Sequence, residues 1–262
     1  MIARWFLYVL ICGITLAAQS ASTCPTDTAA LAHVTNTAAG VTADYAGYTF
    51  LTVSGLNMPT GTRAISALPP GGVLTKTMGG VTVLVNGLPA YLFSYTTQQI
   101  LFLLPRIQPN SCLTLYVEAN GVVQFQAQFF ANATAPGMFT YADGQTIIAS
   151  HADWSLVTTA APAHSGEWIS LWAAGLGLTN PDFEQSQTAV FSAELADKAS
   201  FSVLLNGLPV DPSRIGYAGI APGYAGLYQI NVLLPPTTPV NPEIRLRTAD
   251  NISPAGRFLA VQ

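Results

Sequence analysis

The chain carries one long internal repeat, and this repeat limits the fold more than any other feature. The sequence VLVNGLP at residues 83–89 returns as VLLNGLP at residues 203–209, 120 residues later. The Gly-Leu pair at residues 55–56 returns at residues 175–176 with the same offset. Solenoid repeats usually span about 20–50 residues, so each copy here is long enough to form a domain. The sequence therefore predicts two related domains in tandem.

A third pair of matching segments locates an insertion in the second copy. QILFLLP at residues 99–105 matches QINVLLP at residues 229–235, and the offset is now 130 residues. The second copy therefore has ten extra residues between the Asn-Gly block and this segment. The repeated residues are those that a β-fold requires rather than those that a reaction requires, so the repeat predicts architecture and not activity.

Strand and turn signals follow the same order in both copies. Residues 48–53 and 168–172 are rich in β-branched and aromatic residues, which favour strands. Residues 81–85 and 201–205 run directly into Asn-Gly, the strongest short hairpin signal. Further strands are expected at residues 90–94, 99–104, 113–117, 122–130, 228–234, 244–247 and 258–261. The predicted fold class is all-β, with two tandem immunoglobulin-like β-sandwich domains.

The N-terminus has the pattern of a secretory signal peptide. Arg4 precedes an apolar run at residues 5–18, whose length suits a signal peptide better than a membrane span. Small residues follow, and cleavage is expected after Ser20 or Ala21. An uncleaved membrane anchor is the alternative. We therefore expect an exported protein that is secreted or held at the cell surface.

The expected domain boundaries follow from the repeat and the signal sequence. They are a signal peptide at 1–21, a tail at 22–44, a first domain at 45–131 and a second domain at 132–262. The second domain is expected to begin with a hairpin extension, because the segment between the copies contains too many β-formers for a flexible linker.

The balance of charges excludes some partners. Only 8 % of the residues are charged, against about 25 % in ordinary soluble domains. The formal net charge is −4 and no basic stripe is present, so nucleic acid is not an expected partner.

Two cysteines are left once the signal peptide is removed. Cys24 and Cys112 form an even pair, which permits one disulfide in an exported protein. Such a bond would connect the N-terminal tail to the first domain. Two unpaired thiols are the alternative.

Several blocks resemble one known family. The chain is similar to the Solibacter-type C-terminal domain family of acidobacterial exported proteins over nearly the whole of residues 30–262. The matching blocks are NTAA at 36–39, VNGLPA at 85–90, QILFLLP at 99–105, APGMF at 135–139, ADWS at 152–155, 166–177, and GIAPGYAGLYQINV at 219–232. Each copy also resembles an immunoglobulin-like IPT/TIG module. The resemblance implies export and tandem β-sandwiches, and it carries no catalytic residues over. Trp154 departs from the family, which usually has Gly after this Asp.

Aromatic residues are the best candidates for ligand binding. Because strand side chains alternate, Trp168 and Trp172 share one face while Ile169 and Leu171 share the other. If the aliphatic pair faces the core, the two tryptophans form an outward strip on which sugar rings could stack. The alternative is that they fill the interface to the first domain or to residues 131–165, and buried aromatics are the more common case.

Three tyrosines extend this candidate set. Tyr217, Tyr224 and Tyr228 belong to the insertion-bearing part of the second copy, and loops on a rigid sandwich often carry binding residues. The alternative is that Pro and Gly at residues 221–226 only shape a crossing between sheets.

Catalytic chemistry has little support in the sequence. The three histidines are His33, His151 and His164. The segment HSGE at residues 164–167 lacks the G-x-S-x-G pattern between strand and helix, and Glu167 is expected to cap a turn. A cleft that unites His164 with an acid and a hydroxyl would favour a hydrolase.

Metal and cofactor signals are also weak. Asp143, Asp182 and Glu184 lie in polar loops without the spacing that supplies the roughly six to eight oxygens of a calcium site. The segment GLG at residues 175–177 has neither the third glycine nor the βαβ context of a dinucleotide site. We expect no cofactor.

Two functions follow from these observations, and a third is less favoured. The first is a non-enzymatic binding or adhesion protein whose partner is an extracellular polysaccharide or a cell-surface protein. The second is a structural module of the envelope or matrix without a specific ligand. The third is a hydrolase.

Overall fold

The chain is almost entirely β-structure. The computed structural model describes residues 24, 28–31, 33–58, 61–249 and 251–262. Strands account for 45 % and helix for 4 %, and several sheets pack together, so the prediction of an all-β sandwich is confirmed. The helical elements in the described residues are α1 (Thr28–Leu31), η1 (Lys198–Ser200) and η2 (Pro212–Arg214).

The expected signal peptide, residues 1–21, lies outside the described residues. Among the residues that the structure does describe, no helix has the length and apolar composition needed to cross a bilayer.

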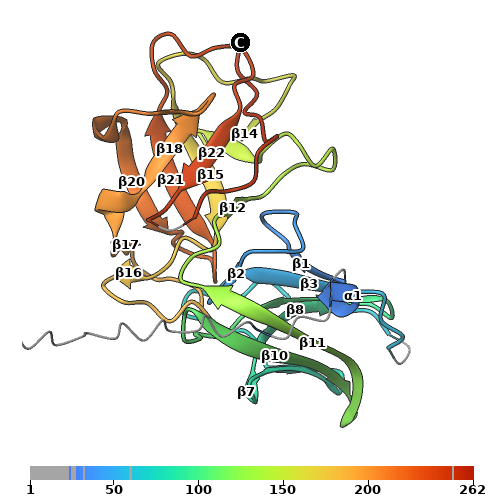
Figure 1. The fold of residues 1–262 in the computed structure, drawn as a ribbon. Helices are drawn as coiled ribbons and strands as arrows, with labels where there is room; N and C mark the ends of the chain where they lie inside the picture. The colour runs from blue at the N-terminus through green and yellow to red at the C-terminus, as the bar shows by residue number, and fades with distance from the viewer. Residues whose placement is uncertain (1–23, 25–27, 32, 59–60, 250) are drawn as a thin grey trace, which may run out of the picture.

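The first half of the chain forms two sheets around one hydrophobic core (Figure 1). A five-stranded sheet has the order β1-β3-β9-β8-β4, and a six-stranded sheet has the order β2-β11-β10-β6-β5 with β7 paired to β6. The strands are β1 (Val34–Asn36), β2 (Tyr45–Ala46), β3 (Phe50–Ser54), β4 (Arg63–Ala64), β5 (Thr77–Met78), β6 (Val81–Val85), β7 (Leu88–Pro89), β8 (Tyr91–Tyr95), β9 (Gln99–Leu103), β10 (Ser111–Ala119) and β11 (Val122–Asn132). Alternating side chains such as Leu51 and Phe102 on one sheet, and Val83 and Leu115 on the other, fill this core.

The second half repeats this plan with a different division of strands. An eight-stranded sheet has the order β14-β13-β15-β21-β20-β17-β16 with β12 paired to β15, and a three-stranded sheet has the order β19-β18-β22. The strands are β12 (Gly137–Met138), β13 (Ala149–His151), β14 (Leu156–Val157), β15 (Trp168–Ala174), β16 (Thr179–Asn180), β17 (Glu194–Leu195), β18 (Ser202–Leu205), β19 (Leu208–Pro209), β20 (Ile215–Ile220), β21 (Tyr228–Leu233) and β22 (Ile244–Arg247). Leu171 and Ile230 meet Val203 and Leu246 in a second core.

The repeated Asn-Gly pairs form matching hairpin turns. Asn86-Gly87 joins β6 to β7 and Asn206-Gly207 joins β18 to β19, and all four residues have positive φ, as a tight hairpin requires. The side-chain oxygen of Asn86 accepts from the backbone N–H of Thr114 at 2.7 Å, and that of Asn206 accepts from Glu243 at 2.8 Å. Each Asn therefore connects its turn to the neighbouring strand as well as forming it.

Three expectations can be compared with the observed strands. Residues 34–36 of the expected tail form β1, which pairs with β3 and belongs to the five-stranded sheet. The hairpin β13–β14 pairs with β15, so the segment between the copies packs on the second half as predicted. Residues 258–261 form no strand, because Phe258 and Val261 make isolated bridges to different partners instead of following one neighbour. The division into two domains stays a prediction.

A third apolar cluster joins the two halves, and we call it the junction cluster. Phe50 and Leu103 come from the outer face of the five-stranded sheet, while Ala174, Ala225 and Phe139 come from the second half. The Phe50 ring lies 5.6 Å from the Phe139 ring, measured between centroids. Both faces of the five-stranded sheet are therefore covered.

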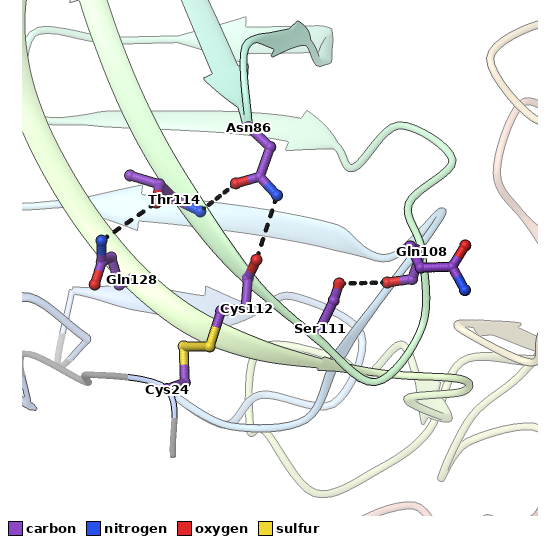
Figure 2. The surroundings of a disulfide bond; sticks show 7 residues. All are labelled: Cys24, Asn86, Gln108, Ser111, Cys112, Thr114 and Gln128. Carbon is purple, nitrogen blue, oxygen red and sulfur yellow. Dashed lines mark hydrogen bonds between the residues drawn. A yellow bond between two sulfur atoms is a disulfide. The ribbon is translucent and has the colours of Figure 1, made fainter. Parts of the chain in front are cut away.

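Cys24 and Cys112 form a disulfide whose Cα atoms are 5.5 Å apart and 88 residues apart in sequence (Figure 2). Cys112 lies on β10, so the bond connects the start of the described chain to the six-stranded sheet. The Asn86 side chain donates to the Cys112 carbonyl at 3.3 Å, and the disulfide therefore adjoins the first Asn-Gly turn.

Candidate ligand-binding surface

Strand β15 places its two tryptophans on the outer face of the eight-stranded sheet. Ile169 and Leu171 are buried in the second core, so the alternation of the strand turns Trp168 and Trp172 away from that core. Trp168 is 43 % exposed and Trp172 is half-buried. The expectation of an outward strip describes Trp168, whereas Trp172 also contacts Ser150 and Trp154 of residues 131–165, as the interface alternative predicts.

Trp172 lies at the centre of a group of three rings, which we call the aromatic cluster. Its ring centroid is 6.2 Å from that of Trp154 and 6.1 Å from that of Tyr224. The indole Nε1–H of Trp172 donates to the Ser150 hydroxyl at 3.0 Å, which fixes the ring on the sheet. Trp154 is 61 % exposed and Tyr224 is 54 % exposed. The outer rings therefore offer large apolar faces to solvent around a fixed central ring.

A row of polar side chains adjoins the aromatic cluster on the same sheet face. Ser170 pairs with Asn231 across the strands, and Trp172 pairs with Gln229. The Asn231 side-chain oxygen accepts from the Ser170 hydroxyl at 3.0 Å and from the Gln229 amide at 2.8 Å. Within the described part of the chain, no group accepts from the Asn231 NH₂. Ser170 and Gln229 are buried, so the half-buried Asn231 is the member of this row that presents a hydrogen-bond donor between the tryptophans of β15.

The loop that carries Tyr224 is anchored by its neighbours. Ala225 is buried in the junction cluster, and Gly226 sits so close to Leu103 that an added Cβ would lie 2.7 Å from the leucine Cδ1. The carbonyl of Tyr224 accepts from the Ala189 N–H at 3.1 Å. The segment at 221–226 joins β20 to β21, which are neighbours in one sheet, so it is a loop within that sheet and not a crossing between sheets. It positions Tyr224, whose role in binding stays a prediction.

Trp154 belongs to the site although the sequence patterns do not assign it there. It has φ of 70°, in the left-handed region where Gly is favoured. The preceding Asp153 closes the turn by accepting from the Ser155 N–H at 3.0 Å. A tryptophan at a position that favours glycine is the one local signal that could have identified it.

The other predicted aromatic residues have different environments. Trp168 packs over Gly216, where an added Cβ would lie 3.0 Å from the tryptophan ring. Tyr217 is half-buried and donates its hydroxyl to the Ile220 carbonyl at 2.6 Å. Tyr228 is corrected: it is fully buried, and its hydroxyl donates to the Gly177 carbonyl. It pairs with Ala173 on the core side of the sheet and has no access to a ligand at the surface.

A surface hollow contains histidine, serine and glutamate, the residue types that a hydrolase uses. His151, Ser155, His164 and Glu167 line it together. His151 Nδ1 lies 2.5 Å from Glu167 Oε1, and His151 Nε2 lies 3.1 Å from the Ala161 carbonyl oxygen. Both partners are acceptors, and the hydrogen bond to Glu167 raises the pKa of His151 above its ordinary value. A ring that donates from both nitrogens has no lone pair with which to act as a base.

Ser155 and the second histidine, His164, make separate hydrogen bonds in this hollow. The Ser155 hydroxyl donates to Asp153 at 2.6 Å and does not contact a histidine. Glu167 accepts from the His164 backbone N–H at 2.8 Å, so it caps the turn as the sequence predicts. His33 lies in the first half beside Phe125. These histidines therefore do not lie next to the Ser155 hydroxyl.

The acidic loop residues have structural partners. Asp143 accepts from the backbone N–H groups of Gln145 and Thr146, and hydrogen bonds led by that of the Thr146 side chain lower its pKa. Asp182 pairs with Arg106. Across the residues that the structure describes, no three His, Cys, Asp or Glu side chains gather as a metal site would require.

Comparison with known proteins gives no match that bears on this site. No protein-family model matches the sequence, and no curated protein matches it. The resemblance to the exported family stays a prediction, and the site is interpreted from its own residues.

Proposed function

We propose that the protein is an exported, non-catalytic β-sandwich protein that binds polysaccharide at the cell surface or in the extracellular matrix. The aromatic cluster of Trp154, Trp172 and Tyr224 carries this proposal. The partner of such a surface must bring an apolar face for the rings and polar groups for the row beside them.

A pyranose ring has both of these features. Its axial C–H groups form an apolar face that stacks on indole or phenol rings, and its hydroxyls accept and donate hydrogen bonds. Asn231 lies opposite Ser170 across the β15–β21 pair, and its NH₂ is directed to no described acceptor. Asn and Gln side chains supply both donors and acceptors, which suits the mixed demands of sugar hydroxyls.

The low charge of the protein favours a neutral ligand. Only 8 % of the residues are charged, and the polar row is formed by Ser170, Gln229 and Asn231. An anionic polysaccharide would require arginine or lysine at such a surface. We therefore favour a neutral polysaccharide over an acidic one.

Export is supported by two features that are independent of the site. The apolar run at residues 5–18 has the length of a signal sequence. The disulfide between Cys24 and Cys112 suits an oxidising compartment.

A structural module of the envelope without a specific ligand is the second candidate. The junction cluster, which packs on the outer face of the five-stranded sheet, favours it because the cluster connects the two halves. The two candidates differ in whether the aromatic cluster has a partner.

The test is affinity electrophoresis of the purified protein through gels that contain neutral polysaccharides such as β-glucan, xylan, mannan or galactan. We expect retardation in at least one gel. Trp154→Ala and Tyr224→Ala should each weaken binding about two- to tenfold, because a stacked ring is worth about 0.5–1.5 kcal/mol. Both side chains are more than half exposed, so neither substitution should unfold the protein.

The matched control is Leu208→Ala, which removes an equally exposed apolar side chain from the β18–β19 turn. Leu208 is 73 % exposed and lies outside the aromatic cluster. Its retardation should equal that of the parent. Absence of retardation in every gel, or equal loss in the Leu208→Ala control, would reject polysaccharide binding at this surface and favour the structural module.

A further inference from the structure

Trp168 lies on the outer face of the eight-stranded sheet but apart from the aromatic cluster. It is 43 % exposed, and its ring reaches across β21 to β20, since a Cβ added at Gly216 would lie 3.0 Å from the indole. Trp172 on the same strand leans the other way, because its Nε1–H donates to Ser150 on β13 at 3.0 Å. The two indoles therefore lie on opposite sides of the β15–β21 pair.

Gly216 makes room for the Trp168 ring. It stands at a bulge in β20, where the pairing with β21 shifts between Ile215 and Tyr217. Its φ is negative, so its backbone conformation does not require glycine, whereas a side chain there would press on the far edge of the indole. The β20 backbone therefore supports the Trp168 ring on one side while the ring stays open to solvent on another. A supported, exposed ring is what stacking of a ligand needs.

Polar side chains separate the two indoles. Ser170 and Asn231 face each other across the β15–β21 pair, and the Asn231 oxygen accepts from Ser170 at 3.0 Å and from Gln229 at 2.8 Å. These bonds fix the Asn231 amide, and its NH₂, which bonds to no described acceptor, is the donor that a ligand can meet between the rings.

The distance between the two ring contacts sets the length of a ligand that uses both rings. Trp172 contacts β13 and Trp168 contacts β20, and the sheet order β13-β15-β21-β20 places these strands three spacings apart. Neighbouring strands are roughly 4.8 Å apart, so the contacts are separated by about 14 Å. One pyranose, or two linked pyranoses, cannot stack on both rings at this separation.

We propose that Trp168 is a second sugar-stacking platform and that the ligand is an oligosaccharide segment that crosses from the aromatic cluster to Trp168 over Asn231. The inference rests on the proposed function, and it adds the minimum length of the ligand and the residue that selects for that length. One sugar stacks in the aromatic cluster, a sugar further along the chain stacks on Trp168, and an oxygen of the segment between them accepts from the Asn231 NH₂. A disaccharide reaches one platform only, so longer chains bind more tightly.

The test compares disaccharides with hexasaccharides by isothermal titration calorimetry of the purified protein. The probes are cellobiose and cellohexaose, xylobiose and xylohexaose, mannobiose and mannohexaose, and galactobiose and galactohexaose. In at least one pair we expect the Kd of the hexasaccharide to be lower by about two- to tenfold or more, the effect of one additional stacked ring. Trp168→Ala should remove this advantage and leave the Kd of the disaccharide within about twofold.

Two matched variants separate the second platform from the aromatic cluster. Trp154→Ala removes an exposed indole of the aromatic cluster and should weaken the disaccharide and the hexasaccharide alike. Gly216→Val keeps Trp168 but occupies the space of its ring, so it should reproduce the loss that Trp168→Ala causes for the hexasaccharide. In the double variant the valine should add no further loss, because the ring that it displaces is already absent.

The outcomes distinguish this inference from the proposed function. Equal Kd values for the disaccharide and the hexasaccharide, or an effect of Trp168→Ala that is the same on both, would overturn the second platform and leave the proposed function in place. Retardation in a polysaccharide gel without binding of any hexasaccharide would also overturn the second platform. No retardation in any gel and no binding of any hexasaccharide would overturn both.

Discussion

Phe50 on β3 and Ser170 on β15 occupy matching places in the two copies, 120 residues apart, and both are buried, but by different partners. Phe50 is buried against the second half in the junction cluster. Ser170 is buried between Trp168 and Trp172 and donates its hydroxyl to Asn231 of its own sheet. On the next strand, Leu101 of the first copy contributes to the junction, whereas Asn231, 130 residues later, begins the polar row.

The difference shows that one sheet can serve as an interface or as a surface, depending on a few outward positions. The inward positions are apolar in both copies: Leu51 and Ile100 in the first match Leu171 and Ile230 in the second, and all four are fully buried. The core therefore preserves the strand order, and the outward residues decide whether the face meets protein or solvent.

The largest effect is expected from Phe50→Ser, which gives the first copy the residue that the second copy has at the matching position, Ser170. Phe50→Ser removes a ring that packs 5.1 Å from Phe93 and 5.6 Å from Phe139, measured between centroids. We expect a loss of about 3–5 kcal/mol in the free energy of unfolding, as for other large-to-small core changes. Urea unfolding measures it, and Ser170→Ala in the second copy should cost less than about 1 kcal/mol. Similar costs for both variants would contradict the comparison.

The disulfide is the next largest difference between the copies. The second copy contains no cysteine, and the first is closed by Cys24 and Cys112, 88 residues apart. The double variant Cys24→Ser/Cys112→Ser should lose about 2–4 kcal/mol, because the unfolded chain regains freedom. Thermal unfolding measures the loss, and polysaccharide retardation at low temperature should be unchanged. Loss of retardation with intact folding would place the ligand surface in the first copy instead.

A pair of glycines tests how the junction positions Tyr224. Gly226 and Gly223 both have positive φ, but only Gly226 has a neighbour, Leu103, within 4 Å of an added Cβ. Gly226→Ala should therefore cost about 1–3 kcal/mol more than Gly223→Ala, the usual range for overpacking. Urea unfolding of both variants gives this difference directly. Equal costs would mean that the loop does not depend on its contact with the first half.

The smallest expected effect concerns the β13–β14 hairpin, which extends the sheet of the second copy. The hydrogen bond to Glu167 raises the pKa of His151 in the folded state. Its stabilisation is therefore fully present below the unfolded value of about 6.5 and is lost as the pH rises through the folded pKa. The side chains are 16 % and 23 % exposed, and we expect less than about 1 kcal/mol after screening.

Unfolding at acidic and at alkaline pH checks this expectation. The parent should lose stability relative to His151→Gln as the pH rises from below 6.5 to above the folded pKa. A constant difference across that range would mean that the pair does not change its charge on folding.

Much of the fold follows from local sequence signals. The Asn-Gly pairs predict the β6–β7 and β18–β19 hairpins, and the predicted strand at 244–247 coincides with β22. These features depend on turn chemistry and side-chain alternation, which act within a few residues. The predicted strand at 258–261 fails because its residues bridge to Thr146, Ala163 and Glu243, and such distant partners leave no local pattern.

Only part of the candidate site could be predicted from the sequence, for the same reason. Alternation predicts that Trp168 and Trp172 share a face, but it does not tell which sheet face meets the other half. Tyr228 is buried through contacts with Gly177 and Gln185, which lie more than forty residues earlier. Trp154 reaches Trp172 because β13 and β14 fold back onto β15, a pairing that the sequence alone does not specify.

Hydroxyl-radical footprinting tests the central comparison most directly, because it reads solvent access and ligand protection at single residues. The account predicts rapid oxidation of Trp154, Trp168 and Tyr224, slow oxidation of Phe50, and slower oxidation of Trp154 and Tyr224 once a retarding polysaccharide is added. Rapid oxidation of Phe50 together with protection of Trp154 and Tyr224 in the free protein would contradict it, since the first copy would then carry the open face.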